Sequence, residues 1–308
     1  RGIRGRHRRE GLTVDSVVPK ALDSHCCPIC GAVDGRYARR GYYDKCPRCK
    51  VAFRALQESE EDLDGYWQEE FWTEREIQKR KDREPVFRHA YSLLERRVPR
   101  AGAVLDIGCG IGTFLAVCRS GGWYVTGVEP SAGACRVAES AYGLDLINAP
   151  FSSALFPEKR FDAVFAAQVV HHLPDPVGFL VDVDRVLAPG GVLMLRTPNL
   201  IALEPGLLLQ RALRRERGFF LGPALYVFHP DTWRLLLGRL GYREVTFANS
   251  RPYLERPPAG GEALGVRAKR LAVTAAKRLG YGTAEAVHRL SAGRAVVGSS
   301  IFVLARKG

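Results

Sequence analysis

The sequence predicts an α/β fold built on a parallel sheet, preceded by a small cysteine-rich module. Residues 103–196 alternate short apolar runs with helical stretches, a pattern typical of parallel strands covered by helices on both faces. Two Cys-x-x-Cys motifs lie close together before residue 53. With 308 residues, 46% of them hydrophobic and 26% charged, the chain is long enough for one large domain and an appendage.

Four parts are expected along the chain. Residues 1–24 form a basic lead-in, and residues 25–53 form the cysteine module. Residues 54–100 are highly charged and carry aromatic side chains at helical spacing, so we interpret them as a helical linker. The α/β domain then occupies residues 101–308.

Strands and helices should alternate within that domain. The apolar runs predict buried strands at 104–107, 124–128, 144–147, 161–166 and 191–196. The stretches between them predict helices at 113–120, 131–142 and 176–187. Beyond residue 198 the pattern is weaker and indicates a cover segment at 200–228, a helix at 229–240, a strand at 243–248, a helical insertion at 258–292 and a last strand at 299–305.

Charge and hydropathy narrow the classes of function. No run of eighteen uncharged apolar residues is present, which excludes a membrane-spanning helix. The net charge of +13 favours an anionic partner such as nucleic acid, a membrane surface or a phosphorylated substrate, with scattered solvated charges as the alternative. The basic lead-in lacks the apolar core of a secretory signal, and eight cysteines in so long a chain do not indicate a disulfide framework. We therefore expect a cytoplasmic protein.

The paired cysteines predict a metal site. Cys27 and Cys30 form one motif, Cys46 and Cys49 form the second, and fifteen residues separate them. Zinc prefers four thiolates in a tetrahedron, and this separation falls in the range of zinc ribbons. Cys26 competes with Cys27 as a ligand, but Cys27 gives the regular spacing. Because four protein ligands leave no open position, we expect a structural Zn²⁺ rather than a catalytic one.

A glycine-rich loop follows the first strand of the α/β domain. Asp106 ends the strand, and Gly108, Gly110 and Gly112 alternate before a helix begins. Glycine is needed where the backbone turns sharply and approaches a ligand closely. Thr113 occupies the position where a dinucleotide fingerprint has its last Gly or Ala, so the loop suits a smaller adenosine ligand. Asp106 could hold the loop amides or an ammonium group of the ligand.

A carboxylate ends the second strand. Glu129 lies twenty-three residues after Asp106, directly beyond the apolar run 124–128. An acid at this position in nucleoside-binding α/β sheets accepts hydrogen bonds from the ribose hydroxyls. The loop, the following helix and the acid together therefore predict a nucleoside site.

On these motifs, residues 101–200 resemble the class I S-adenosylmethionine-dependent methyltransferases. The matching segments are Asp106 to Gly112, Glu129, residues 161–164 and residues 187–191. The resemblance implies a Rossmann-like seven-stranded sheet, with its last strand antiparallel, and S-adenosylmethionine bound across the carboxyl ends of the strands. It places the glycines of the loop, Gly108 and Gly110 above all, beside the methionine portion, Glu129 at the ribose, and Phe151 or Ser152 at the adenine.

The segment after the fourth strand holds the candidate catalytic residues. Gln168 is expected to contact the cofactor, and His171 and His172 follow it. A neutral imidazole could take the proton of a substrate hydroxyl as the methyl group arrives. The alternatives are that these histidines cap loop amides, or that positioning alone suffices and no base is needed.

The sequence as a whole predicts methyl transfer to a small or carrier-linked metabolite, such as a sugar, lipid or natural-product precursor, with oxygen favoured as the acceptor atom. The alternative is a ribosomal RNA methyltransferase whose zinc ribbon and basic surface bind RNA, since such enzymes also carry a zinc-knuckle module. A third reading is a non-catalytic scaffold whose ribbon recruits a protein partner. The cover segment and the helical insertion, both basic, could contact a membrane surface peripherally or could simply pack on the core.

Overall fold

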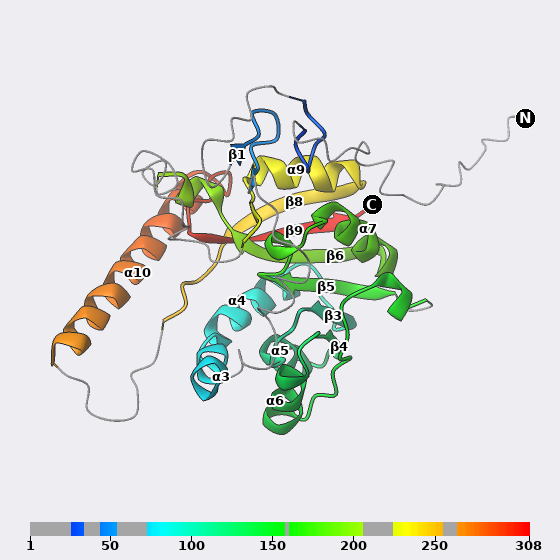
Figure 1. The fold of residues 1–308 in the computed structure, drawn as a ribbon, viewed down its shortest axis with the longest axis horizontal. Helices are drawn as coiled ribbons and strands as arrows, with labels where there is room; N and C mark the ends of the chain where they lie inside the picture. The colour runs from blue at the N-terminus through cyan, green and yellow to red at the C-terminus, as the bar shows by residue number, and fades with distance from the viewer. Residues whose placement is uncertain (1–25, 34–43, 54–72, 158–159, 206–223, 255–263) are drawn as a thin grey trace, which may run out of the picture.

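The computed structural model describes residues 26–33, 44–53, 73–157, 160–205, 224–254 and 264–308 (Figure 1). The basic lead-in therefore lies outside the described residues, as does most of the predicted cover segment. Among the described helices, none has the length and apolar character needed to cross a membrane.

A six-stranded mixed sheet forms the centre of the molecule. Its first four strands in space run parallel, in the order β4 (Tyr124–Val128), β3 (Ala103–Ile107), β5 (Phe161–Ala167) and β6 (Leu187–Pro198). Antiparallel β9 (Ser300–Lys307) then lies between β6 and β8 (Tyr242–Asn249). The carboxyl ends of the parallel strands meet at one edge, where the predicted glycine loop and acid both lie.

The sheet has six strands because the expected strand at 144–147 is reduced to a single bridge. Ile147 pairs in parallel with Val128 beside β4. Leu144 instead belongs to the end of the preceding helix, since its N–H donates to the carbonyl of Ala138 at 3.4 Å. Leu144 therefore ends the helix and does not lengthen a seventh strand. The expected antiparallel last strand is present as β9.

Capping residues explain why the helices begin and end where they do. Helix α6 (Ala132–Tyr142) follows Ser131, whose hydroxyl accepts from the Ala134 N–H, and left-handed Gly143 ends it. Asp175 accepts from the Gly178 N–H at 2.8 Å to begin α7 (Pro176–Val186). His229 Nδ1 caps α9 (Pro230–Arg239). Both α7 and α9 have proline at the first position, where no N–H is needed.

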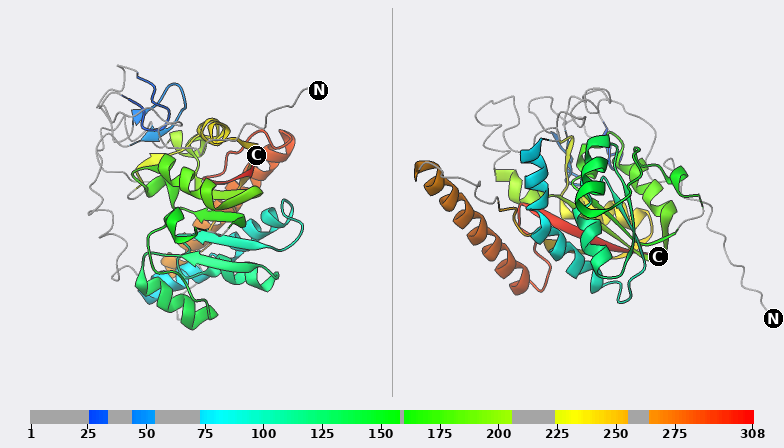
Figure 2. Two further views of the ribbon diagram at one scale, coloured as in Figure 1. Left: turned by 90° about the vertical axis from the view of Figure 1, so that its right-hand side faces the viewer. Right: turned by 90° about the horizontal axis from the view of Figure 1, so that it is seen from below.

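Helices cover both faces of the sheet (Figure 2). On one face lie α5 (Thr113–Ser120) and α4 (Glu84–Glu95), with α3 (Glu74–Lys81) preceding α4. The rings of Phe114 and Phe165 lie 4.1 Å apart between α5 and β5, and Phe87 of α4 packs on both. Helix α4, expected within a linker, therefore contributes to the core of the α/β domain, while α7 and α9 cover the opposite face.

The cysteine module joins the sheet body through strand pairing. Strands β1 (Asp44–Lys45) and β2 (Ala52–Phe53) of the module form a small antiparallel sheet with β7 (Tyr226–Val227). The Thr232 hydroxyl of α9 donates to the Cys49 carbonyl at 2.6 Å. Residues far apart in the sequence are thereby fixed side by side above α9, as Figure 1 shows.

The predicted insertion at 258–292 contains a single long helix, α10 (Leu264–Leu290). Its contact with the body includes a hydrogen bond from Asn249 Nδ2, at the end of β8, to the Ala284 carbonyl at 3.0 Å. Much of its length extends away from the sheet (Figures 1 and 2).

The aromatic contact between α5 and β5 predicts the response of the core to truncation. Phe165→Ala should lower the free energy of unfolding by about 3–5 kcal/mol, because it removes a fully buried ring and leaves a cavity. Tyr124→Ala, in β4 of the same sheet, serves as the control, because its side chain is exposed and the change should stay within about 0.5 kcal/mol. Urea unfolding of both variants checks this, and equal losses would contradict the packing.

Candidate functional site

The glycine loop follows β3 and requires its glycines. Gly108, Gly110 and Gly112 have φ of 65°, 56° and 75°, the left-handed region that other residues rarely adopt. A Cβ atom on Gly108 would lie 2.6 Å from Cγ2 of Val169. The loop therefore packs directly against the segment that follows β5, which brings the predicted cofactor loop and the candidate histidine segment together.

Glu129 is fixed by the loop that it faces. One carboxylate oxygen accepts from the Gly110 N–H at 2.8 Å, and the other accepts from the Ser131 N–H at 3.0 Å. Burial raises the pKa of Glu129, while these two amides and the charge of Arg80 act in the opposite direction. Each oxygen keeps a second lone pair, so the group can accept further hydrogen bonds in a set direction.

Asp106 is buried at the end of β3, and its carboxylate accepts no hydrogen bond from the described part of the chain. The loop amides bond elsewhere: those of Gly108 and Cys109 donate to the Val128 carbonyl. Burial, and then the charge of Glu129, raise the pKa of Asp106 well above its usual value. Of the two roles expected for Asp106, a contact with the loop amides is not made among the described residues, and the role toward a ligand stays a prediction.

The segment after β5 places the histidines. Gln168 adopts a left-handed conformation (φ 61°), and its N–H donates to the Arg196 carbonyl at 2.8 Å. His171 and His172 belong to a short 3-10 helix, η3 (Val170–His172), and their ring centres lie 4.0 Å apart. Burial, followed by His172 and Arg196, lowers the pKa of His171 well below its usual value, so that its imidazole is neutral at pH 7.

The expected adenine-side residues make local contacts. The Ser152 hydroxyl accepts from the Ala154 N–H at 3.3 Å and so caps the 3-10 helix η2 (Ser153–Leu155). The Phe151 ring packs edge-on against Phe179 of α7, with ring centres 5.6 Å apart. The assignment of Phe151 and Ser152 to an adenine stays a prediction.

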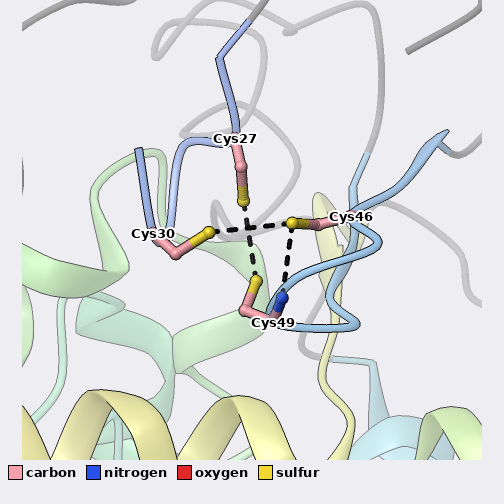
Figure 3. Close-up of side chains that lie close together, drawn as sticks. All are labelled: Cys27, Cys30, Cys46 and Cys49. Atoms are coloured by element: carbon pink, nitrogen blue, oxygen red, sulfur yellow. Dashed lines mark hydrogen bonds between the residues drawn. The ribbon is translucent and has the colours of Figure 1, made fainter. Parts of the chain in front are cut away.

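Four cysteines converge in the N-terminal module (Figure 3). The sulfur atoms of Cys27, Cys30, Cys46 and Cys49 lie within 4.8 Å of one another, and all four residues are buried. The two pairs joined in the figure are 3.6 and 3.7 Å apart, whereas a disulfide bond is about 2.05 Å. Four thiolates around Zn²⁺, each about 2.3 Å from the metal, would lie about 3.8 Å apart. The set is therefore suited to a tetrahedral zinc ion.

The two adjacent cysteines lie in different surroundings. Cys26 is half-buried, its backbone forms an isolated antiparallel β-bridge with Val33, and its sulfur is not part of the cluster. Cys49 donates its N–H to the Cys46 sulfur at 3.4 Å, a contact that orients the turn between these two cysteines.

Sequence reasoning missed the arginines at this edge of the sheet. Arg196 ends the buried run of β6, and its Nε donates to the Ser250 hydroxyl at 2.8 Å. Arg83 at the start of α4 lies over the Tyr253 ring, 5.4 Å from its centre. One sequence signal could have pointed to Arg196: a charged residue that directly follows four apolar residues of a predicted strand. Arg80 and Arg83 were missed because they lie in the stretch interpreted as a linker.

Known proteins have sequences similar to part of this chain. A family model described as "Methyltransferase domain" matches residues 79–246. Over 117 residues the chain is 36% identical to cycloartenol-C-24-methyltransferase 1 of Oryza sativa subsp. japonica, covering 35% of this chain and 34% of that protein. It is 33% identical to the ubiquinone biosynthesis O-methyltransferase of Thiobacillus denitrificans, covering 34% of this chain and 49% of that protein. The matched region thus spans between a third and a half of these relatives.

Solved structures are also similar. One is an S-adenosylmethionine-dependent methyltransferase from Archaeoglobus fulgidus, with 19% identity, a TM-score of 0.43, and coverage of 72% of this chain and 94% of that one.

The sulfur cluster predicts a zinc requirement. Elemental analysis of purified protein should find one zinc per chain, and Cys46→Ser should lose it and lower the melting temperature, because one of four ligands is removed. Cys135→Ser is the control, since Cys135 lies outside the cluster and should keep the metal. Protein without zinc, whose melting is indifferent to a chelator, would contradict the site.

Proposed function

Because the chain belongs to the class I S-adenosylmethionine-dependent methyltransferase family, whose model matches more than half of it, we propose that it transfers the methyl group of S-adenosylmethionine to a small or carrier-linked metabolite. The observation that supports this most directly is the Gly110 to Glu129 hydrogen bond, made while Gly108 of the same loop packs on the segment that carries His171.

The residues at the edge of the sheet fit the donor. Asp106 is a buried carboxylate without a hydrogen-bond partner among the described residues, as an acid reserved for a ligand ammonium group would be. Glu129 has lone pairs left for two ribose hydroxyls, and the left-handed loop around Gly108 and Gly110 allows close approach of a ligand to the backbone. When bound, S-adenosylmethionine supplies an electrophilic methyl group on its sulfonium sulfur.

His171 suits an oxygen acceptor, and we propose oxygen as the methylated atom. Its lowered pKa keeps the imidazole neutral, and Nδ1 has no hydrogen-bond partner in the described part of the chain. A neutral imidazole can accept the proton of a hydroxyl, while binding in one orientation removes much of the entropic barrier. Gln168 and His172, on either side of this residue, belong to the same proposed acceptor wall.

The proposed zinc ion would act at a distance from the reaction. Strand β2 of the cysteine module pairs with β7, and Leu225 just before β7 donates its N–H to the His171 carbonyl at 2.8 Å. Holding the module in shape therefore holds the backbone beside His171. This gives the zinc a structural role in the acceptor wall.

The relatives support a small-molecule acceptor. One is named for methylation of cycloartenol and another for ubiquinone biosynthesis, both small molecules. Incubation with methyl-labelled S-adenosylmethionine and fractionated cell extract tests the class directly. Label in small molecules or lipids is expected; label in RNA would favour the nucleic-acid alternative, and label in no fraction would contradict the proposal.

The Glu129 carboxylate predicts a selective loss of donor binding. Glu129→Gln should weaken S-adenosylmethionine about tenfold to a hundredfold, because hydrogen bonds to a charged group contribute about 1.5–3 kcal/mol. Glu139→Ala, on the exposed side of α6, is the control and should bind as the parent does. Calorimetry measures both, with circular dichroism to verify folding. Unchanged affinity in Glu129→Gln would refute the proposed ribose contact.

A further inference from the structure

Arg196 lies at the carboxyl end of β6, next to the proposed acceptor wall. It is opposite Ala167 of β5, the residue before Gln168, and opposite Phe302 of β9. Side chains alternate along a strand, so Arg196 shares a face with Met194, which packs in the core beneath α4. Arg196 is therefore expected on the face of the sheet that α4 covers, near the start of that helix.

A second guanidinium reaches the same place from α4. Arg196 bonds to Ser250, and Arg83 covers the ring of Tyr253, so both arginines contact the short segment that follows β8. They approach it from different elements, one from the sheet and one from the helix that covers it. The segment 250–253 therefore brings the two cations to one site.

Neither cation is in direct contact with a carboxylate of the described residues. Among the described residues, neither Arg83 nor Arg196 forms an ion pair. Burial, and then the like charge of Arg83, lower the pKa of Arg196 to about 9. Burial also lowers the pKa of Arg83, while the charges of Tyr253 and Glu76 act in the opposite direction. Withdrawing two guanidinium groups from water without an ion-paired carboxylate is unfavourable, so the site is suited to an anion.

Resting on the proposed function, we propose that Arg196 and Arg83 bind a carboxylate or phosphate group of the methyl acceptor. The planar fork of arginine donates two parallel hydrogen bonds to either group. Arg196 also acts electrostatically on His171, so an acceptor held by its anion would present a neighbouring hydroxyl to that imidazole. The carboxylate of the donor is the other anion available, and the test separates the two.

The experiment uses full-length protein saturated with S-adenosylhomocysteine. Inorganic phosphate or acetate should raise its melting temperature more than chloride at equal ionic strength. Arg196→Gln and, separately, Arg83→Gln should lose this rise while binding S-adenosylhomocysteine within about twofold of the parent. Arg88→Gln is the control, because Arg88 is an exposed residue of the same helix, paired with Glu84, and should keep the rise.

Each failure has a distinct meaning. If the parent does not bind S-adenosylhomocysteine, the proposed function fails. If the parent binds S-adenosylhomocysteine, the anion site alone is overturned by either of two results. Phosphate and acetate raise the melting temperature no more than chloride does, or they raise that of Arg196→Gln as much as that of the parent. If Arg196→Gln weakens S-adenosylhomocysteine yet leaves methylthioadenosine, which has no carboxylate, unaffected, the arginine holds the donor and the acceptor assignment is wrong.

A separate observation concerns the outward face of α10. Leu271, Leu279 and Leu290 are 59%, 74% and 89% exposed, and Ala275 and Ala286 are exposed between them. Successive members are four, four, seven and four residues apart, which puts all five on one side of the helix. The side toward the body instead carries buried Ala284. We define the outward set as the apolar stripe of α10.

Positive charge flanks this stripe. Residues 264–290 contain six Lys and Arg and one acid, Glu285, a net charge of +5 (six minus one). Exposed Arg267, Arg278 and Arg289 lie along one border of the stripe, and exposed Lys269 lies beyond the other. Helix α10 extends away from the sheet (Figure 1), and the leucines and alanines of the stripe are exposed.

Charge complementarity selects one occupant. A second copy would bring another +5 helix against the first, and nucleic acid would satisfy the charges but leave the leucines in water. An anionic bilayer surface satisfies both, because leucines enter the boundary of the acyl chains while Lys and Arg meet the headgroups. We infer that α10 docks the protein on an anionic membrane surface.

Co-sedimentation with vesicles tests this second inference. The protein should bind phosphatidylcholine vesicles containing phosphatidylglycerol and not those of phosphatidylcholine alone. Leu271→Glu/Leu279→Glu should weaken binding at least tenfold. Val266→Glu/Val273→Glu makes the same change in charge at exposed positions off the stripe and should retain most of the binding.

Three results would overturn the docking surface: no binding by the parent, equal binding to neutral vesicles, or equal losses in the two double variants. A concentration-dependent dimer in ultracentrifugation that only the Leu271→Glu/Leu279→Glu change abolishes would assign the stripe to a second copy instead.

Discussion

The hydrogen bond from the Gly110 N–H to the Glu129 carboxylate is the contact on which the site depends. It joins the loops that follow two neighbouring parallel strands, and it can form because the register of β3 and β4 ends both at the same edge, with Ile107 opposite Val128. The left-handed glycines give the loop its shape and leave it without the side chains that would collide with Val169. One buried carboxylate thus sets the direction of the proposed ribose contact, while the close approach of Val169 to Gly108 joins the loop to the histidine segment.

A second chain of contacts supports the opposite wall of the site. The sulfur cluster shapes the cysteine module, the module pairs through β2 with β7, and the residue before β7 bonds to the backbone of His171. Thr232 of α9 ties the same module to the body through the Cys49 carbonyl. Segments separated by more than 180 residues therefore meet in one small sheet, which explains why a structural metal would belong in a protein whose proposed chemistry does not use it.

Local sequence signals made much of the fold predictable. Features that depend on contacts between distant residues could not be predicted. The helix Thr113–Ser120 and the strand Tyr124–Val128 have the predicted bounds, because a glycine loop and a tight turn limit them. The expected strand at 144–147 was wrong in extent, since Leu144 caps a helix. The four cysteines could be chosen from spacing alone, and the structure brings them together. No spacing in the sequence pairs Arg83 with Arg196, because only the packing of α4 on the sheet brings both to the segment after β8.

The edge of the sheet is consequently divided by charge. Asp106 and Glu129 lie at the ends of β3 and β4, whereas Arg196 and Arg83 lie at the end of β6 and the start of α4. A sulfonium donor is cationic, so the acidic side suits it, and an anionic acceptor suits the basic side; in a site of low dielectric both preferences are stronger than in water. His171 follows β5, between the two sides. Burial above all, and then the charges of His172 and Arg196, lower its pKa and keep its imidazole neutral. The arginine proposed to hold the acceptor therefore contributes, after burial and His172, to keeping the proposed base in the form that can take a proton.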